Sequence, residues 1–302
     1  MTHGSTIEPM PEHGCATDSW AVDKQQIEII PLPALMEMTP PEVRSLVEKV
    51  HLQKDVATTY MQMYYVFLLS QQYEAALDMQ TRALRLRRVF RIRGKSEPLL
   101  RLLVVMGPGI MLDNTPIEFV LHGCQIETSI LYLLPSDDVV GNLPKHDITF
   151  VAIGESSTNL PLLEKMQAMM KDWPTPVVNQ PVFIKNCARD KCYQLLQGIP
   201  GIYMPATMKV HQGELIKNDF PITIRPIDTQ GGEGLEKIED AVALARYCAS
   251  YPAQEYYVAK FLNYQSHDGH YRKMRIVMID GKPVVSQRFS EENKLLRLET
   301  RI

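Results

Sequence analysis

The stretch PITIRPIDTQGGEGLEKIED, residues 221–240, joins a short apolar run to a glycine-rich loop. The run ITI predicts a strand that ends at Arg225, and the loop that follows holds Gly231, Gly232 and Gly234. A guanidinium at a strand end offers a fork of donors to phosphate oxygens. Glycines let backbone N–H groups approach phosphates closely. The stretch therefore indicates a phosphate-binding loop, although a plain turn between a strand and a helix remains an alternative.

The segments on either side of this stretch extend the pattern. RDKCYQLL (189–196) predicts a short helix that carries Lys191, and it is followed by a turn and an extended segment. After a predicted helix at 238–249, EYYVAKFLNY (255–264) predicts another strand. YRKMRIVMIDGKPV (271–284) predicts a hairpin with an Asp-Gly turn, whose basic residues would add positive charge from a second side.

Residues 98–183 predict a different unit, in which strands alternate with helices. The predicted strands are 99–106, 128–134 and 148–153, and the predicted helices are 115–122 and 159–171. Such alternation is typical of a parallel sheet of Rossmann type. Gly107-Pro108-Gly109 after the first strand lacks the third glycine of a dinucleotide fingerprint, so we expect a tight turn rather than a nicotinamide site.

The order of these elements resembles the ATP-grasp family, which includes D-alanine–D-alanine ligase, over residues 98–285. The resemblance implies that ATP binds and that Lys191 and Arg225 contact its phosphates, where the second position is usually lysine. It implies that Gly231, Gly232 and Gly234 form the mobile phosphate loop. It further implies a strand and hinge that hold adenine (Tyr257, Val258, Ala259, Lys260, Phe261, Leu262) and a basic residue near the phosphates (Arg275). Ala259 departs from the family, in which a carboxylate is common there.

ATP-grasp chemistry makes an acyl phosphate from a carboxylate and ATP, and the family resemblance also implies Mg²⁺. Its ligands should lie on strands beyond the 271–285 hairpin. Glu291, Glu292 and Asn293 follow no apolar strand, so we expect the start of a polar helix or a frayed end, and we assign no metal ligand. The sequence thus predicts a partial ATP-grasp domain at 184–302. Either another chain completes the site, or the protein is a truncated and catalytically silent relative.

The N-terminal third predicts a loose leader at 1–35 and a helical segment at 36–97. Thr39, followed by two prolines and Glu42, is a helix start. QQYEAALDMQTRALRLRR (71–88) resembles the second helix of a tetratricopeptide repeat, because small alanines allow a paired helix to approach closely. An ordinary amphipathic helix pair is an open alternative. A second hypothesis for function follows, in which residues 36–97 bind a peptide or a partner protein without catalysis.

Composition excludes several classes of protein. The chain has 302 residues, 45% hydrophobic and 22% charged, which is ordinary globular usage. A net charge of −3 gives no electrostatic reason to expect a nucleic-acid partner. We expect neither a signal peptide nor a membrane span. Five scattered cysteines without a CxxC pair predict reduced thiols, no zinc site and a cytoplasmic location. The predicted fold class is α/β, with helical hairpins, a Rossmann-like lead domain and a partial ATP-grasp domain.

Overall fold

The chain divides into two compact units, Met1–Lys185 and Asn186–Ile302, and each is described by itself. The computed structural model describes residues 28–50, 52, 54–92, 97–137, 142–217, 219–230, 232–279 and 281–292. Gly231, Asp280 and Asn293, which the sequence predictions used, lie outside the described residues.

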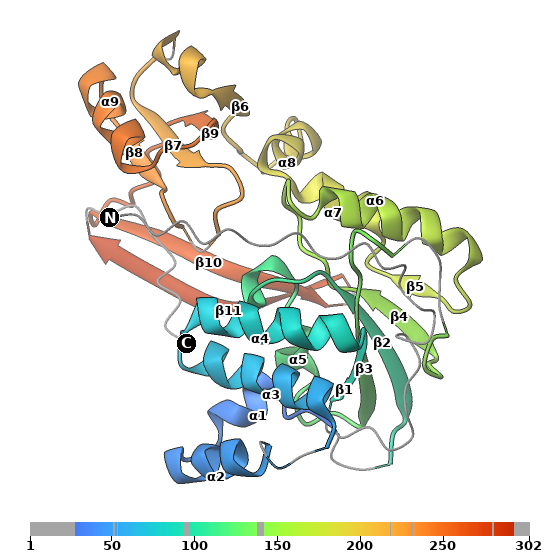
Figure 1. Ribbon diagram of the computed structural model, residues 1–302. Coiled ribbons are helices and arrows are strands. Elements are labelled where there is room, and N and C mark those ends of the chain that lie inside the picture. The colour runs from blue at the N-terminus through green and yellow to red at the C-terminus, as the bar shows by residue number, and fades with distance from the viewer. Residues whose placement is uncertain are drawn as a thin grey trace. The chain divides into compact units, whose positions relative to one another are not determined.

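The first unit is a sheet with helices on both faces (Figure 1). Its helices are α1 (Leu32–Met36), α2 (Pro40–Val50), α3 (Val56–Leu69), α4 (Tyr73–Leu86), α5 (Ile117–Leu121), α6 (Leu160–Met169) and α7 (Pro181–Ile184). Its strands are β1 (Val89–Ile92), β2 (Leu100–Met106), β3 (Ile126–Tyr132), β4 (Ile148–Val151) and β5 (Val177–Val178). The strand order is β1-β3-β2-β4-β5.

The parallel pairing predicted for the central strands is confirmed. β2 pairs in parallel with both β3 and β4, and β4 pairs in parallel with β5. β1 is the exception, since it pairs antiparallel with β3 at one edge of the sheet. β2 lies between β3 and β4, both of which follow it in the chain. The direction in which successive strands are added to the sheet therefore reverses at β2, as in doubly wound sheets.

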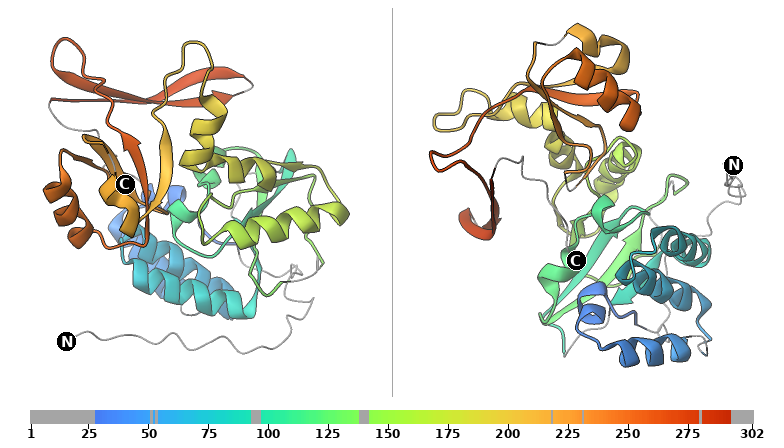
Figure 2. Two further views of the ribbon diagram at one scale, coloured as in Figure 1. Left: turned by 90° about the horizontal axis from the view of Figure 1, so that it is seen from above. Right: turned by 90° about the vertical axis from the view of Figure 1, so that its left-hand side faces the viewer.

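Alternation along the strands divides the core between the two faces of this sheet. Leu102, Val104 and Met106 of β2 pack with α1, α3, α4 and α5, whereas Leu103 and Val105 pack with α6 and α7. Figure 2 shows the paired helices α3 and α4 on one side of the sheet and α6 on the other. The apolar faces of the helix pair are therefore buried within this unit.

Two predictions at the N-terminal end need correction. The helical segment predicted at 36–97 is not helical to its end, because α4 ends at Leu86 and Val89–Ile92 form a strand. Arg87 is extended at the end of α4, and Phe90 is fully buried against the sheet. Residues 28–35 were expected to be loose, yet Ile29 bridges Ile92 and is fully buried.

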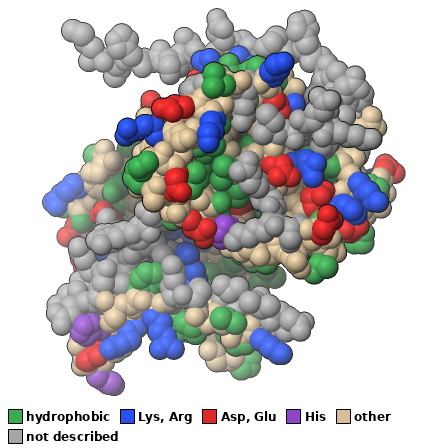
Figure 3. All heavy atoms as spheres, turned by 90° about the horizontal axis from the view of Figure 1, so that it is seen from below, with side chains coloured by type: hydrophobic (Ala, Val, Ile, Leu, Met, Phe, Trp, Pro, Cys, Tyr) green, Lys and Arg blue, Asp and Glu red, His purple; other side chains and the backbone are tan. Residues whose placement is uncertain are grey.

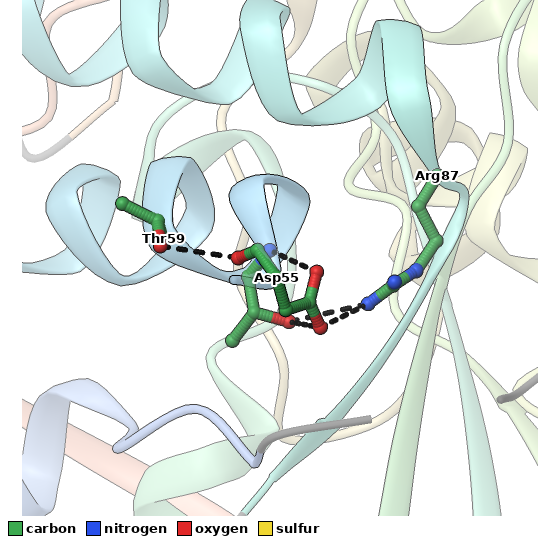
Figure 4. A network of polar contacts seen from close by, with 4 residues as sticks. Asp55, Thr59 and Arg87 are labelled. Atoms are coloured by element: carbon green, nitrogen blue, oxygen red, sulfur yellow. Dashed lines mark hydrogen bonds and ion pairs between the residues drawn. The ribbon is translucent and has the colours of Figure 1, made fainter. Parts of the chain in front are cut away.

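Asp55 fixes the start of α3 and joins it to the end of α4 (Figure 4). Its Oδ1 accepts the backbone N–H of Thr58 at 3.2 Å, and its Oδ2 accepts the Thr58 hydroxyl at 2.7 Å. Arg87 donates to the same Oδ2 at 2.8 Å. Thr59 adds a hydroxyl bond of 3.1 Å to the Asp55 carbonyl. The Asp55 carboxylate thus caps the N-terminus of α3 and also binds Arg87, the residue that follows α4.

The loop after β2 is held by side chains of its own unit. Asn114 accepts the Gly107 N–H at 2.8 Å and donates to the Gly107 carbonyl at 2.9 Å. Gln80 of α4 makes the same double contact with Gly109, at 2.8 and 3.1 Å, and Tyr64 of α3 donates to the Gly109 carbonyl at 2.8 Å. The segment is a tight turn, as predicted, and its backbone groups are bound by the protein itself.

The described part of the second unit contains a four-stranded antiparallel sheet, two α-helices and a separate hairpin. The sheet has the order β6-β9-β7-β8. Its strands are β6 (Thr207–His211), β7 (Ile222–Pro226), β8 (Glu236–Ile238) and β9 (Glu255–Lys260). The helices are α8 (Arg189–Leu196) and α9 (Ala241–Ser250), and the hairpin strands are β10 (His270–Ile279) and β11 (Lys282–Glu292).

One face of this sheet carries the core of the second unit. Ile222 and Ile224 of β7 lie beside Tyr256 and Val258 of β9, and α9 covers them with Leu244 and Tyr247. Since side chains alternate along a strand, the residues between them point to the other face. That second face holds the candidate site.

Two further predictions differ from the structure. The helix expected at 238–249 begins only at Ala241, after Asp240 caps the Ala243 N–H at 2.8 Å, and Glu236–Ile238 form a strand. Glu291 and Glu292 were expected to start a helix or fray, but they end β11, opposite Tyr271 and His270.

No helix in the described part of the chain is long and apolar enough to cross a membrane. On the surface shown in Figure 3, acidic and basic side chains are interspersed among uncharged ones.

Candidate functional site: a cationic sheet face

A row of three residues crosses the face of the second unit's sheet that lies opposite its core. Lys209 of β6 lies opposite Tyr257 of β9, and Tyr257 lies opposite Arg225 of β7. Their neighbours Val210, Tyr256 and Ile224 pack in the core on the other face. We call Arg189, Lys209, Arg225 and Lys273, together with Tyr257, the cationic face.

Arg225 is positioned by the turn that follows its own strand. Its Nε donates to the Thr229 hydroxyl at 3.0 Å, and one terminal nitrogen donates to the Thr229 carbonyl at 2.5 Å. The Thr229 hydroxyl in turn donates to the Pro226 carbonyl at 2.8 Å, which closes the turn. Arg225 is only 8% exposed, so the turn holds a desolvated guanidinium at the end of β7.

Arg189, at the start of α8, lies close to Thr229 and to Tyr257, which are also neighbours of Arg225. It donates to the Thr229 carbonyl at 3.3 Å, and its guanidinium carbon lies 5.4 Å from the centre of the Tyr257 ring. The Lys209 ammonium lies 5.5 Å from that ring centre. Cation–π attraction stabilises both charges beside Tyr257. Two guanidiniums therefore share one carbonyl oxygen, and two cations share one ring.

The charges on this face repel each other. Burial and the nearby Arg189 charge lower the pKa of Arg225 to about 10. Burial, and then repulsion from Arg275 and Arg225, lower the pKa of Lys273 on β10. Among the described residues, no acidic side chain forms an ion pair with Arg189, Arg225 or Lys273. A bound anion would relieve this repulsion.

The glycine loop connects β7 to β8 beside Arg225. Gly232 and Gly234 have φ of +93° and +62°, a region that L side chains rarely adopt. A Cβ on Gly234 would lie 2.7 Å from Cδ of Pro226. Tyr247 of α9 donates to the Gly234 carbonyl at 2.6 Å. The loop is thus anchored at its C-terminal end, and Glu233 on it lies near enough to attract Arg225.

The strand expected to hold adenine is β9 and the segment after it. Tyr257 faces the cationic side and Val258 the core. Lys260 is exposed, Leu262 is 37% exposed, and the Phe261 N–H donates to the Pro221 carbonyl at 3.0 Å. The Lys237 ammonium lies 4.2 Å from the centre of the Phe261 ring. Lys237 pairs opposite Thr223, so it shares the face of Arg225.

The structure brings some of the predicted residues together and leaves others apart. Arg225 and Tyr257 lie side by side, and Arg275 is close enough to shift the pKa of Lys273. Lys191 is exposed on α8 and makes no contact with the cationic face among the described residues, whereas Arg189 does. Arg272 forms an ion pair with Asp268 instead.

Sequence reasoning missed Arg189 and Lys209. Arg189 lies two residues before the lysine that the family pattern favoured, and Lys209 is placed by the pairing of β6 with β9. In the sequence, the signal for Lys209 was its position as a basic residue in the strand that precedes β7.

The described residues include no group of three or more His, Cys, Asp or Glu side chains that could hold a metal ion.

Comparison with known proteins gives matches among solved structures alone. No protein-family model and no curated protein matches the chain. D-alanine–D-alanine ligase from Bacillus anthracis is 15% identical with a TM-score of 0.39, over 65% of this chain and 72% of that one. A RimK domain ATP-grasp protein from Sphaerobacter thermophilus is 14% identical with a TM-score of 0.37, over 57% and 68%. N5-carboxyaminoimidazole synthetase from Staphylococcus aureus, complexed with ADP, is 10% identical with a TM-score of 0.40, over 67% and 57%. Of these three solved structures, one is described as a ligase, one as an ATP-grasp protein and one as a synthetase complexed with ADP.

Proposed function

We propose that the cationic face binds the phosphates of ATP, and that the chain is an ATP-grasp-like nucleotide-binding protein related to carboxylate–amine ligases. The observation that carries this proposal is the convergence of Arg225 and Arg189 on the carbonyl of Thr229. Neither arginine forms an ion pair with an acidic residue within the described chain. Buried cations are normally paired, so a partner that carries several negative charges completes the arrangement.

Each part of the face has a role in this binding. Arg225 and Arg189 present planar forks of donors, which suit phosphate oxygens. Lys273 supplies a point charge, and the glycine loop supplies backbone N–H groups. The segment from Tyr257 to Leu262 offers an aromatic and apolar edge for adenine. Fixing the guanidiniums on a strand and a helix orients the phosphates before any reaction occurs.

In carboxylate–amine ligases, ATP supplies the phosphoryl group that activates a carboxylate as an acyl phosphate. For this chain, the residues described support binding and orientation of the nucleotide.

The first test is a calorimetric titration of the full chain with ATP, with and without Mg²⁺. We expect saturable binding that weakens as salt is added, because several charges are neutralised. Arg225→Ala should weaken binding about tenfold or more, the effect of losing a charge-assisted hydrogen bond. Arg225→Lys should retain part of the affinity, since it keeps the charge but loses the fork.

Arg246→Ala is the matched control for this titration. Arg246 is exposed on α9, the helix that covers the core face of the same sheet, so its removal costs one positive charge elsewhere in the unit. We expect unchanged affinity. Equal affinities of wild type and a folded Arg225→Ala variant would contradict the proposal.

A further inference from the structure

The Thr229 hydroxyl lies between the turn after β7 and Arg225, and all of its hydrogen-bonding capacity is used. It donates its hydrogen to the Pro226 carbonyl at 2.8 Å. It accepts from Nε of Arg225 at 3.0 Å and from Nη2 at 2.8 Å. A hydroxyl has one donor and two lone pairs, so this one has nothing left to offer a ligand. The hydroxyl therefore acts on the cationic face only through Arg225.

The same contacts decide which donors of Arg225 remain for a ligand. A guanidinium carries one N–H on Nε and two on each terminal nitrogen. The Thr229 hydroxyl occupies the edge formed by Nε and Nη2, and the Thr229 carbonyl accepts from Nη2 at 2.5 Å. Nη1 makes no hydrogen bond within the part of the chain that the structure describes. Arg225 is thus left with the donors of one nitrogen at its tip.

These bonds also fix the plane of the Arg225 guanidinium. Nε, Nη1 and Nη2 are coplanar, so contacts to two of these nitrogens determine where the third points. Arg225 is buried, and breaking the contacts would leave its N–H groups unpaired, which is costly. Arg189 differs, since its single hydrogen bond among the described residues is the 3.3 Å contact with the Thr229 carbonyl. Most of the Arg189 donors are therefore available to a ligand.

We infer that Thr229 is a positioning residue, which makes Arg225 present one terminal nitrogen, Nη1, to the phosphates of the nucleotide. This role rests on the nucleotide binding proposed above. Arg225 then serves the ligand as a compact point of positive charge, much as a lysine ammonium does, and Arg189 supplies the wider fork of donors. It follows that the Thr229 hydroxyl contributes to binding only while residue 225 is an arginine.

The test is a double-mutant cycle at positions 225 and 229 of the full chain, read by calorimetric titration with ATP. Thr229→Val keeps the shape of the side chain but frees the guanidinium plane, so it should weaken binding about fivefold or more. In the Arg225→Lys background the same substitution should change the affinity less than about twofold, because a lysine has no plane to fix. Thr229→Ser keeps the hydroxyl and should restore the wild-type affinity. Equal losses in the two backgrounds would mean that Thr229 only stabilises the turn, and would overturn the inference.

Two further variants guard the cycle. Thr223→Val is the matched control, because Thr223 lies on β7 on the same face as Arg225 and its hydroxyl makes no hydrogen bond among the described residues. Its affinity for ATP should equal that of wild type. Thr229→Ala removes the Thr229 hydroxyl with a smaller side chain and should behave as Thr229→Val does, so the cycle can be completed even if the valine variant does not fold.

A spectroscopic signature separates this inference from the nucleotide proposal. The Nε–H signal of Arg225 is identified by its absence from the proton–nitrogen NMR spectrum of Arg225→Lys. In the ligand-free wild type it should exchange slowly with water, because the Thr229 hydroxyl binds it. Exchange should be faster in Thr229→Val and unchanged in Thr223→Val. A wild type that binds no ATP would refute the proposed function, whereas equal exchange in wild type and Thr229→Val would overturn the role of Thr229 whether or not ATP binds.

Discussion

At the scale of single residues, Asp55 combines the cap of α3 with an ion pair to Arg87. Replacing it with alanine removes both, so Asp55→Ala should lower the free energy of unfolding by about 1–2 kcal/mol. Asp78→Ala is the control, because Asp78 pairs with Arg82 on the exposed surface of α4 and such pairs contribute less than about 1 kcal/mol. Urea denaturation of the two variants measures the difference. Equal losses would contradict the role assigned to Asp55.

The charge of Asp55 also predicts a pH dependence. Burial opposes its ionisation, but hydrogen bonds from Arg87 and Thr58 outweigh burial and lower its pKa. The stabilisation is then present above the unfolded pKa of about 3.9 and lost as the pH falls through the lower folded value. Asp55→Asn should therefore be less stable than wild type at neutral pH, and the gap should close below that folded pKa. Denaturation curves across this range test the prediction, and a constant gap would refute it.

The sequence could predict some residues of the cationic face and not others. Arg225 stands out because it ends an apolar run and precedes a glycine loop, both of which are local signals. Lys209 and Arg189 reach Tyr257 through the pairing of β6 with β9 and the position of α8. Partners in the pairing of Thr207–His211 with Glu255–Lys260 lie 44 to 52 residues apart, and such pairing leaves no trace in the local pattern of either strand.

At the scale of elements, the glycine loop predicts a difference between two Gly→Ala substitutions. Gly234 and Gly198 both have positive φ, at +62° and +79°. A Cβ on Gly234 would also meet Pro226, whereas nothing lies within 4 Å of one on Gly198. Both substitutions strain the backbone by about 1 kcal/mol, but Gly234→Ala should cost clearly more and should weaken ATP binding. Thermal unfolding and titration distinguish them, and equal losses of stability would show that the close approach to Pro226 is tolerated.

The close packing of α3 on α4 gives a second test at this scale. Ala76 of α4 is fully buried in the core between the helices and the sheet. Ala76→Leu should destabilise the protein by about 1–3 kcal/mol through overpacking. Ala168→Leu, on the exposed side of α6, adds the same atoms where there is room. Chemical denaturation should show little change for Ala168→Leu, and a similarly small change for Ala76→Leu would contradict the packing described.

The elements found from the sequence include the central strands of the first unit with α2, α3, α4 and α6. In the second unit they include α8, β7, β9 and the β10–β11 hairpin. β1 was missed because Val89–Ile92 continue directly from a basic helical pattern and pair with a strand that comes later in the chain. β8 was missed because it has three residues, too few to show a period of two. The strand predicted for β11 was too short, because the residues at its end are polar. Pairing with β10 extends β11 to Glu292.

At the scale of the whole molecule, the proposed nucleotide site lies within the second unit, around β7 and β9. The proposal uses no residue of the first unit, so the experiments on Arg225 test the second unit by itself.

The most direct test of the central claim is hydrogen exchange of the full chain with and without saturating ATP. Ordered contacts with the nucleotide should slow exchange in segments 222–235 and 255–262, which hold Arg225, the glycine loop and Tyr257. Segment 126–132, the β3 strand inside the first unit, should exchange at the same rate in both samples. Slower exchange confined to the first two segments is the predicted result. ATP that leaves both segments unchanged would contradict the assignment of the cationic face as the nucleotide site.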